Sequence, residues 1–351
     1  MADASAALNR LLQDCSRAKA APLRRVSPHD LVIRRRRSGT GFSYLGPSGR
    51  ALRDSATLRR LKSLAVPPAY EEVLYADDPR AHLQAVGRDA AGRLQYRYHP
   101  EWEKVRERRK AKRLVALVEA LPRIRRHVTK HLATGEPSRE FVLAAIIQLV
   151  ARSAIRPGSE AYLKAHGTRG ASTLLKSNLS LKRDMVVLEF RGKGGHDVER
   201  SIRCKQLAKA LAVLQQLPGK RLFQYRDDAG DLRAVSGRDV NDFLYATAGV
   251  RISLKDFRTL LASTFVLEKL AHIPPADSER MRRKQILEAV RSAADELANT
   301  PTVCKRSYVH DTVFAAFENG ALKRLSPKLK QCRSESGREK ILAQIVVAAG
   351  R

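Results

Sequence analysis

The stretch RLQYRYHPEWEKVRERRKAKRLVALVEALPRIRRHVTKHLA, residues 93–133, contains the change of pattern that decides the fold. Its beginning favours a β-strand, and beyond Pro100 the apolar residues recur at the spacing of a helix. Pro122 lies within the helical part, where its missing N–H and its ring predict a kink or a break. The sequence therefore predicts a β-rich region before residue 100 and a mainly helical region after it.

Before Pro100, short β-favouring segments alternate with turns rich in Gly, Pro and Asp, and helical periodicity appears only near residues 55–64. The segments are LVIRRRR (31–37), GFSYLG (41–46), EEVLYA (71–76) and RLQYRYH (93–99). The run Arg34 to Arg37 would charge both faces of its strand, which suits a solvated edge strand or a contact with phosphate. We expect an α+β fold with these parts: a flexible basic arm (1–26), a small mostly-β domain (27–104) and a larger, mainly α-helical domain (105–351).

The helical region contains one predicted β-hairpin. MVVLEF (185–190) and ERSIRC (199–204) flank RGKGGHDV, whose glycines suit a tight turn. Farther along, a helix near 278–298 has one apolar stripe, and Asn299 is expected to end it in the left-handed conformation. Thr300 and Pro301 suit the cap and the first position of the next helix.

Charge is the strongest signal in the composition. Lys and Arg total 67 against 36 Asp and Glu in 351 residues, which gives a formal net charge of +31. Such an excess repels itself unless a polyanion neutralises it. The basic residues are scattered along the chain rather than gathered on one amphipathic helix, so we expect nucleic acid, not a membrane surface, as the partner.

The cysteines and the apolar runs bear on cofactors and on location. The four cysteines form no CxxC pattern, and neither a zinc site nor a disulfide framework is expected. The longest apolar run, FVLAAIIQLVA (141–151), is too short to span a bilayer, and the N-terminus lacks the order of a secretion signal. We expect a cytoplasmic protein without a metal or another cofactor.

Four segments of the helical region concentrate residues suited to a phosphodiester. They are AIRPGSEAY (154–162), FRGKGG (190–195), LKDFRT (254–259) and ANTPTVCKRSY (298–308). The residues that they supply are Arg156, Lys193 at the hairpin tip, Lys255 and Arg258 on one helical face, Asn299 and Tyr308.

Phosphoryl transfer to a tyrosine needs side chains of these types. Two guanidiniums hold the non-bridging oxygens bidentately, and an amide donates one further hydrogen bond. A lysine between glycines at a hairpin tip can approach a duplex closely and protonate the leaving oxygen. No cluster of carboxylates is evident in the sequence, so a metal-ion mechanism is not indicated.

These segments, in this order, resemble the type IB DNA topoisomerases of the bacterial and poxvirus-like branch. The resemblance covers nearly the whole chain, and the interval between Asn299 and Tyr308 (308 − 299 = 9) contributes to it. The further matching segments are GFSYLGPSGRALRDSATLRRLKSLAVPPAY (41–70), HLQAVGRDAAGRLQYRYHPEW (82–102), LPGKRLFQY (217–225) and DVNDFLYATAG (239–249). One departure is Leu260, where the family has tryptophan, and we interpret it as a change of packing.

The resemblance implies a role for each matching residue. Tyr308 would be the nucleophile, Arg156 and Arg258 would stabilise the transition state, and Lys193 would be the general acid. Asn299 stands where many members have histidine and would contact a non-bridging oxygen. The expected DNA-binding residues are Gln95, Tyr96, Tyr98 and Lys255, the last without an assigned role. Of the two tyrosines, one is expected to pack on the sheet, because alternate side chains of a strand point oppositely.

The implied function is relaxation of supercoiled duplex DNA by transient cleavage of one strand through a 3′-phosphotyrosyl intermediate, rotation and religation, without ATP or metal. A monomer that clamps duplex DNA in the nucleoid is expected. Two alternatives remain: a tyrosine recombinase and a non-catalytic basic DNA-binding protein. Recombinases carry a His-x-x-Arg box where this chain has Lys255 and Arg258, and their N-terminal domain is helical.

Overall fold

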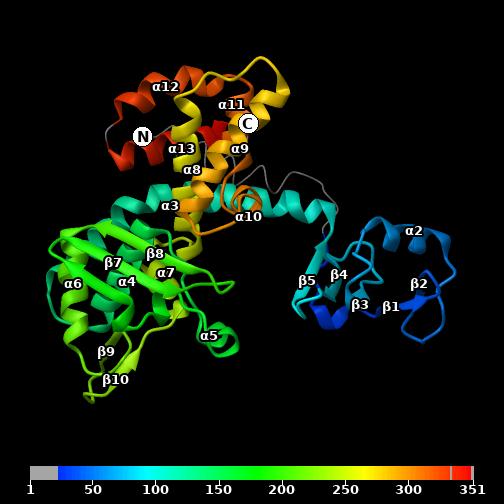
Figure 1. Cartoon of the computed structure of the whole chain (residues 1–351), viewed down its shortest axis with the longest axis horizontal. Helices are drawn as coiled ribbons and strands as arrows, with labels where there is room; N and C mark the ends of the chain where they lie inside the picture. Colours follow the sequence, from blue (N-terminus) through cyan, green and yellow to red (C-terminus); the bar gives the residue numbers. More distant parts are fainter. Residues whose placement is uncertain (1–22, 333, 349–351) are drawn as a thin grey trace. The chain divides into compact units, whose positions relative to one another are not determined.

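The computed structural model describes residues 23–332 and 334–348 (Figure 1). The chain divides into two compact units within helix α3 (Pro100–Ala133), one ending at Arg109 and the other beginning at Lys110. The domain limits expected from the sequence, 27–104 and 105–351, place their boundary in the same helix and stay a prediction. Most of the expected basic arm, residues 1–22, lies outside the described residues.

The N-terminal unit is an antiparallel sheet of five strands in the order β2-β1-β3-β4-β5. Its elements are β1 (Ile33–Ser38), β2 (Gly41–Leu45), α2 (Ser55–Ser63), β3 (Glu71–Tyr75), β4 (Leu83–Arg88) and β5 (Leu94–Tyr98). Helix α2 begins where the Asp54 carboxylate accepts a hydrogen bond of 2.7 Å from the backbone N–H of Thr57. Its Leu61 packs with inward side chains of the sheet, including Ile33 and Tyr75.

The arginine run of β1 does not lie on an edge strand. Strand β1 is hydrogen-bonded to β2 along its length and to β3 through Ile33 and Arg34, so the edge-strand interpretation is wrong. Arg35 has a structural role, because its guanidinium lies 4.2 Å from the centroid of the Phe42 ring and donates hydrogen bonds to the carbonyls of Val66, Pro67 and Tyr70. The loop between α2 and β3 supplies these three carbonyls, and they make an arginine favourable at position 35.

The C-terminal unit consists of helices and a small antiparallel sheet of order β6-β7-β8 (Figure 1). The strands are β6 (Leu179–Lys182), β7 (Met185–Arg191), β8 (Asp197–Arg203), β9 (Gln224–Arg226) and β10 (Leu232–Ala234). The helices that follow α3 are α4 (Arg139–Ser153), α5 (Glu160–His166), α6 (Lys205–Gln216), α7 (Gly237–Ala248), α8 (Leu254–Ala271), α9 (Glu279–Glu296), α10 (Pro301–Ser307), α11 (Asp311–Glu318), α12 (Ala321–Gln331) and α13 (Glu335–Ala348). The α+β class expected from the sequence is confirmed.

Two helices form the centre of this unit. Helix α4, which contains the longest apolar run of the chain, is buried on nearly all sides and packs on α6, α7 and α8. Helix α8 also packs on α9, α11, α12 and α13. Helix α3 continues through Pro122, so a break at that residue is excluded. The two buried helices form a rigid base for the segments that follow them.

The expected hairpin is confirmed, and the end of α9 differs by one residue from the prediction. In the β7–β8 turn, Gly194 and Gly195 take φ values of +85° and +77°, which glycine adopts without strain. After α9 the left-handed residue is Ala298 (φ +46°), not Asn299. The N–H groups of Ala298 and Asn299 bond back to the carbonyls of Asp295 and Ala294, which is the Schellman pattern with Ala298 at its left-handed position.

Candidate active site

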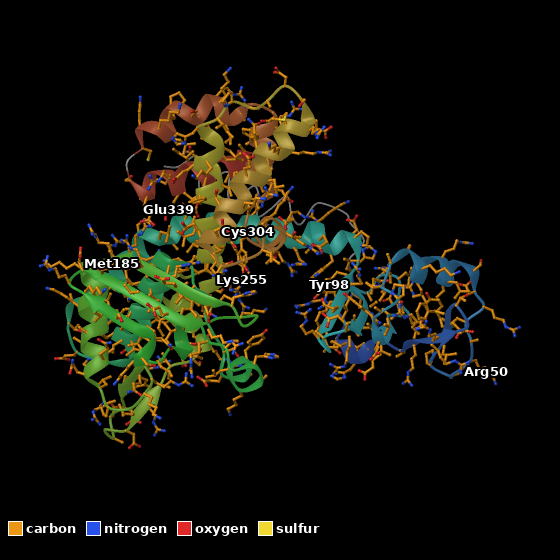
Figure 2. The ribbon with its side chains drawn as sticks, viewed as in Figure 1. Arg50, Tyr98, Met185, Lys255, Cys304 and Glu339 are labelled. Atoms are coloured by element: carbon orange, nitrogen blue, oxygen red, sulfur yellow. The ribbon has the colours of Figure 1, made fainter. Side chains whose placement is uncertain are left out.

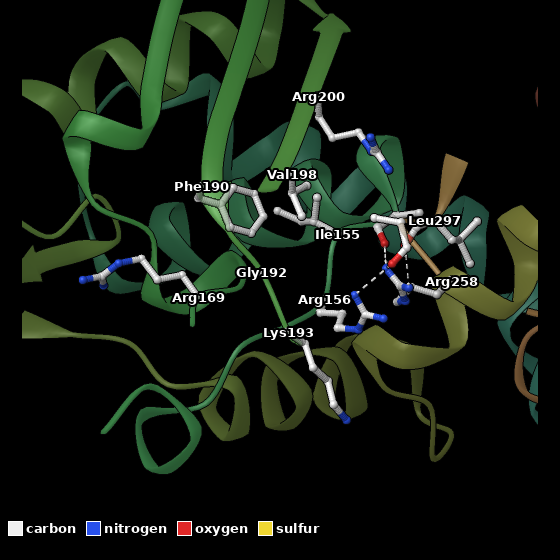
Figure 3. Close-up of a pocket in the computed structure, with 12 residues that line it drawn as sticks. Ile155, Arg156, Arg169, Phe190, Gly192, Lys193, Val198, Arg200, Arg258 and Leu297 are labelled. Atoms are coloured by element: carbon white, nitrogen blue, oxygen red, sulfur yellow. Dashed lines mark hydrogen bonds between the residues drawn. The ribbon is translucent and has the colours of Figure 1, made fainter. Parts of the chain in front are cut away.

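Three of the basic residues expected at the site line one pocket (Figure 3). Arg156, Lys193 and Arg258 share it with Arg200 of β8 and with the C-terminal turn of α9. In Figure 3 the side chains of Arg156 and Arg258 lie side by side below Leu297, and the end of the Lys193 side chain points away from them. The tertiary fold therefore assembles residues from four separate segments of the chain.

Arg258 is the most deeply buried of these cations, with 1% of its surface exposed. It lies on the first turns of α8, which starts with a capping box in which the Asp256 carboxylate accepts bonds from Ser253 N–H (2.7 Å) and Oγ (2.8 Å). Its guanidinium donates to the carbonyl of Ala154 and, at 3.1 Å, to that of Leu297. A buried guanidinium is costly unless it is hydrogen-bonded, and here backbone carbonyls replace the water that it has lost.

Arg156 is held close by, in the loop after α4. The helix ends in Ala154, which has a left-handed φ of +53°. The guanidinium of Arg156 donates to the carbonyl of Ala298 at 3.3 Å and to the Oδ1 of Asn299. Gly170 packs against this loop so closely that a Cβ there would lie 2.5 Å from the Arg156 carbonyl oxygen, so only glycine fits.

The side-chain amide of Asn299 has its oxygen bonded and its nitrogen buried without a bond. Its Oδ1 accepts from Arg156, which fixes the orientation of the side chain. Its Nδ2 is buried and has no hydrogen-bond partner among the residues that the structure describes. A buried donor left without an acceptor is costly, and such a group suits a ligand oxygen that completes the bond. The next residue, Thr300, caps α10 through Val303 N–H (3.3 Å) and Pro301 follows at the first position, as expected.

Tyr308 follows α10 directly and is 9% exposed. Its carbonyl accepts from the Oγ of Ser263 at 3.1 Å, and the carbonyl of Val309 accepts from the Nζ of Lys110 at 2.9 Å. These two bonds fix the segment to α8 and α3. Ser263 and Lys110 were not predicted from the sequence, because a serine and a lysine within helical patterns carry no distinctive signal.

The surroundings of Tyr308 change the acidity of its phenol. Burial alone raises the pKa of Tyr308, but the charge of Arg258, a hydrogen bond from Arg258 and the charges of Arg156 and Lys255 together lower it below its ordinary value. The Arg258 guanidinium carbon lies 4.7 Å from the centroid of the Tyr308 ring. The phenol is therefore easier to ionise than an isolated tyrosine, although it lies among apolar side chains.

The two lysines lie at the margin of this group. Lys193 is exposed on the β7–β8 turn, and its Nζ lies 5.4 Å from the centroid of the Tyr162 ring, on α5. Lys255 is exposed on the first turn of α8 and acts on Tyr308 through its charge. The structure thus bonds Arg156 to Asn299 and places Arg258 against the ring of Tyr308. Lys193 lines one pocket with the two arginines, and its ammonium lies near the ring of Tyr162.

The expected DNA-binding residues of the N-terminal unit lie on β5, an edge strand of its sheet (Figure 2 labels Tyr98). Tyr96 and Tyr98 point the same way, with stacked rings whose centroids are 6.3 Å apart, so the expectation of opposite directions is wrong. Side chains two residues apart in a strand share a face, and the pair obeys that rule. Tyr96 is 43% exposed, Tyr98 packs on a small apolar cluster, and Gln95 donates to the Asp89 carboxylate at 2.9 Å.

Over residues 23–332 and 334–348, no group of three or more His, Cys, Asp and Glu side chains is placed to hold a metal ion. Within the same ranges, no helix has the length and apolarity that crossing a membrane requires.

A tyrosine whose pKa is lowered by two arginines, near a buried amide donor and a pocket that the arginines share with a lysine, is an arrangement suited to phosphoryl transfer to tyrosine. Comparison with known proteins identifies the family. Residues 99–336 match the model of the catalytic core of eukaryotic DNA topoisomerase I, and residues 41–89 match that of the N-terminal domain of bacterial DNA topoisomerase IB. The chain belongs to the type IB DNA topoisomerase family, which confirms the resemblance found in its motifs.

Curated relatives agree with this assignment. The DNA topoisomerase 1B of Acanthamoeba polyphaga mimivirus is 29% identical over 294 residues, which are 82% of this chain and 88% of the relative. The DNA topoisomerase 1B of Vaccinia virus (strain Copenhagen) is 25% identical over 239 residues, 68% of this chain and 73% of the relative. The DNA topoisomerase I of Monkeypox virus gives the same values.

Proposed function

We propose that this chain, as a type IB DNA topoisomerase, relaxes supercoiled duplex DNA by cleaving one strand through Tyr308, allowing rotation, and resealing the strand. One observation carries the assignment of Tyr308. Its phenol is largely buried, yet its pKa is lowered, because Arg258, Arg156 and Lys255 outweigh the effect of burial. A phenol that only packs in a core has no need of three cations.

The proposed chemistry exchanges one phosphoester for another. The phenolate oxygen of Tyr308 attacks phosphorus, a bond from the tyrosine to the 3′ phosphate forms, and the bond to the 5′ oxygen breaks. The 5′ oxygen takes a proton and leaves as a hydroxyl. Religation is the reverse reaction, in which that hydroxyl attacks the phosphotyrosine and the phenol leaves. Because the ester energy is conserved in the intermediate, ATP is not required. We propose that the guanidiniums supply the positive charge at the phosphate, so that no metal ion is needed.

We assign stabilisation of the transition state to Arg156, Arg258 and Asn299. Negative charge grows on the non-bridging oxygens as the phenol attacks, and preorganised donors stabilise it most where water is excluded. Arg156 and Arg258 lie on one pocket, and the unpartnered Nδ2 of Asn299 supplies a neutral donor beside them. An amide cannot exchange a proton near neutral pH, so the proton for the leaving oxygen must come from another residue.

We assign that proton to Lys193. Its place on a turn with two left-handed glycines lets the ammonium move from Tyr162 toward the leaving oxygen without distortion of the strands. Lys193 also lines the pocket that contains both arginines. A positioned general acid contributes roughly 10²–10⁴-fold to a rate, which sets the scale of the loss expected when Lys193 is removed.

The remaining expectations are part of this proposal. Gln95, Tyr96, Tyr98 and Lys255 contact DNA, and the stacked, partly exposed rings of the tyrosines support a role against sugar or base edges. The formal charge of +31 supports association with a polyanion. We propose a monomer that clamps duplex DNA and works in the cytoplasm, on the nucleoid, with the expected domain limits 27–104 and 105–351.

The decisive test is covalent trapping of the proposed intermediate. Tyr308→Phe should bind duplex DNA and give no adduct when the reaction is stopped with detergent, since phenylalanine lacks the attacking oxygen. The matched control is Tyr245→Phe, which removes a hydroxyl from a tyrosine of α7 that is 52% exposed, and this variant should form the adduct normally. A trapped adduct with Tyr308→Phe refutes the assignment.

A further inference from the structure

Arg200 occupies a position where the strand pattern requires an apolar residue. In β8, Val198 and Ile202 are each 7% exposed and face the core, while Glu199, Ser201 and Arg203 are exposed. Arg200 lies between Val198 and Ile202 and, by the alternation of a strand, faces inward with them. An inward arginine is unfavourable unless its charge is compensated and its donors are bonded, so this residue needs an explanation.

The compensation comes from the C-terminal turn of α9. The Nη2 of Arg200 donates to the carbonyls of Asp295 (3.1 Å) and Glu296 (2.9 Å). These are among the last carbonyls of the helix, at the negative end of its dipole, and that of Asp295 also accepts from the N–H of Ala298. The two bonds join the strand that follows the Lys193 turn to the helix that precedes Asn299. Figure 3 shows Arg200 on the same pocket as the other cations.

The same turn of α9 also holds the two arginines of the proposed site. Arg258 donates to the carbonyl of Leu297, and Arg156 donates to that of Ala298 and to Asn299. Residues 295 to 298 therefore offer four successive carbonyls, and each one accepts from a guanidinium. Three positive charges that repel one another are held at one helix end, two for the reaction and one, Arg200, that reaches it from the hairpin strand.

We propose that Arg200 is a positioning residue for DNA cleavage. By bonding β8 to the end of α9, it keeps the hairpin that presents Lys193 at a fixed distance from Asn299 and Tyr308. Without the two bonds the strands still pair, but the ammonium of Lys193 is displaced from the leaving oxygen of the phosphate. This inference rests on the proposed role of Lys193, and it assigns to Arg200 a role that acts through the hairpin rather than on the phosphate or the phenol.

The experiment compares Arg200→Met with Arg203→Met in single-turnover cleavage at saturating enzyme. Methionine suits an inward strand position, so the fold should persist, and both variants lose one charge from the same strand. Arg203 is an exposed residue of the same strand, paired with Asp184 at 3.7 Å. A misplacement of about 1 Å can cost roughly 10²-fold in rate, so we expect cleavage by Arg200→Met to be about 10- to 100-fold slower, and by Arg203→Met to be within about threefold of the unmodified chain.

A second substrate identifies which group is misplaced. A duplex whose leaving group is a 5′ thiolate needs little protonation, so Arg200→Met should regain most of its rate on it, as Lys193→Ala should. Adding Arg200→Met to Lys193→Ala should then slow cleavage of normal DNA by less than about threefold, since the misplaced group is already absent. Arg200→Lys, which can still donate to one carbonyl, should lie between the two extremes.

Three outcomes overturn the proposal: an unchanged rate for Arg200→Met, an equal defect on both substrates, or fully additive losses in the double variant. Its failure is separable from failure of the proposed function. If Lys193→Ala shows no recovery on the thiolate substrate, the acid role of Lys193 is wrong. If Lys193→Ala recovers and Arg200→Met does not, only the positioning role of Arg200 is wrong.

Discussion

Replacing Arg258 with methionine tests how this chain activates a buried tyrosine. In the folded chain burial raises the pKa of Tyr308, and Arg258 makes the largest opposing contribution, through its charge and a hydrogen bond. Methionine occupies a similar volume and removes both. The pKa of Tyr308 should therefore rise, and the phenolate that attacks phosphorus should form only at higher pH.

The structure also sets the size of the loss in rate. Arg258 is a preorganised donor at the proposed transition state, and removing one such donor costs about 10²–10³-fold, or roughly 2.7–4 kcal/mol. At neutral pH each unit of rise in the pKa of the nucleophile makes the phenolate roughly tenfold rarer. We expect a loss of at least about 10²-fold at neutral pH, part of which is recovered at alkaline pH.

Stability should change less than activity. The variant leaves the carbonyls of Ala154 and Leu297 without a donor, at roughly 1–3 kcal/mol each. It also removes the cost of burying a guanidinium that is 1% exposed, which acts in the opposite direction. The variant should therefore fold, and urea unfolding at neutral pH checks this.

The assay is single-turnover cleavage measured across pH, together with NMR titration of ¹³C-labelled tyrosine. Tyr308→Phe assigns the titrating signal among the nine tyrosines. The control is Arg283→Met, because Arg283 is an exposed residue of α9 paired with Glu279 at 2.5 Å. Arg258 lowers the pKa of Tyr308 most, followed by Arg156 and then Lys255. We therefore expect the pKa of Tyr308 to rise most in Arg258→Met, less in Arg156→Met and least in Lys255→Met. An unchanged pKa in Arg258→Met, or a different order, refutes this account of the site.

Three further predictions use other features of the chain. Lys193→Ala should slow cleavage of normal DNA by roughly 10²–10⁴-fold and recover on a 5′-thiolate leaving group; equal defects on both substrates exclude the acid role. Gly170→Ala should destabilise the Arg156 loop by about 1–3 kcal/mol in urea unfolding, because its Cβ would lie 2.5 Å from backbone atoms. Gly41→Ala, whose Cβ meets nothing nearer than 3.9 Å, is the control, and equal stabilities contradict the packing argument. The logarithm of the affinity for duplex DNA should fall with the logarithm of salt concentration by about 0.9 per phosphate contact, and a flat response in a binding titration contradicts the clamp.

Several features could be predicted from sequence because they depend on neighbouring residues. The β7–β8 hairpin follows from two strand-like runs around glycines, and the start of α10 follows from Thr300 and Pro301. The change from sheet to helix near Pro100 was visible in the periodicity alone. Motif order also identified the family, which the match over residues 99–336 confirms.

Other features were mispredicted because distant residues decide them. Asn299 is the better residue for a left-handed position, yet Ala298 adopts that conformation. The carbonyl oxygen of Ala298 and the side-chain oxygen of Asn299 both accept hydrogen bonds from Arg156. Arg35 looked like a residue of a solvated edge, but three loop carbonyls bind it. In each case, hydrogen bonds between a guanidinium and carbonyls distant in the chain compensate for a local preference that is not met.

The sequence by itself determined the order of elements, the residue types of the site and the basic charge of the chain, because these depend on local periodicity and composition. Only the tertiary structure decided that Arg258 is buried against Tyr308, that Asn299 keeps a free donor, and that Arg200 joins the hairpin to α9. The physical reason is that burial and hydrogen-bond partners depend on residues far apart in the chain. The acidity of the phenol is set by that balance of desolvation and charge, which no single segment contains.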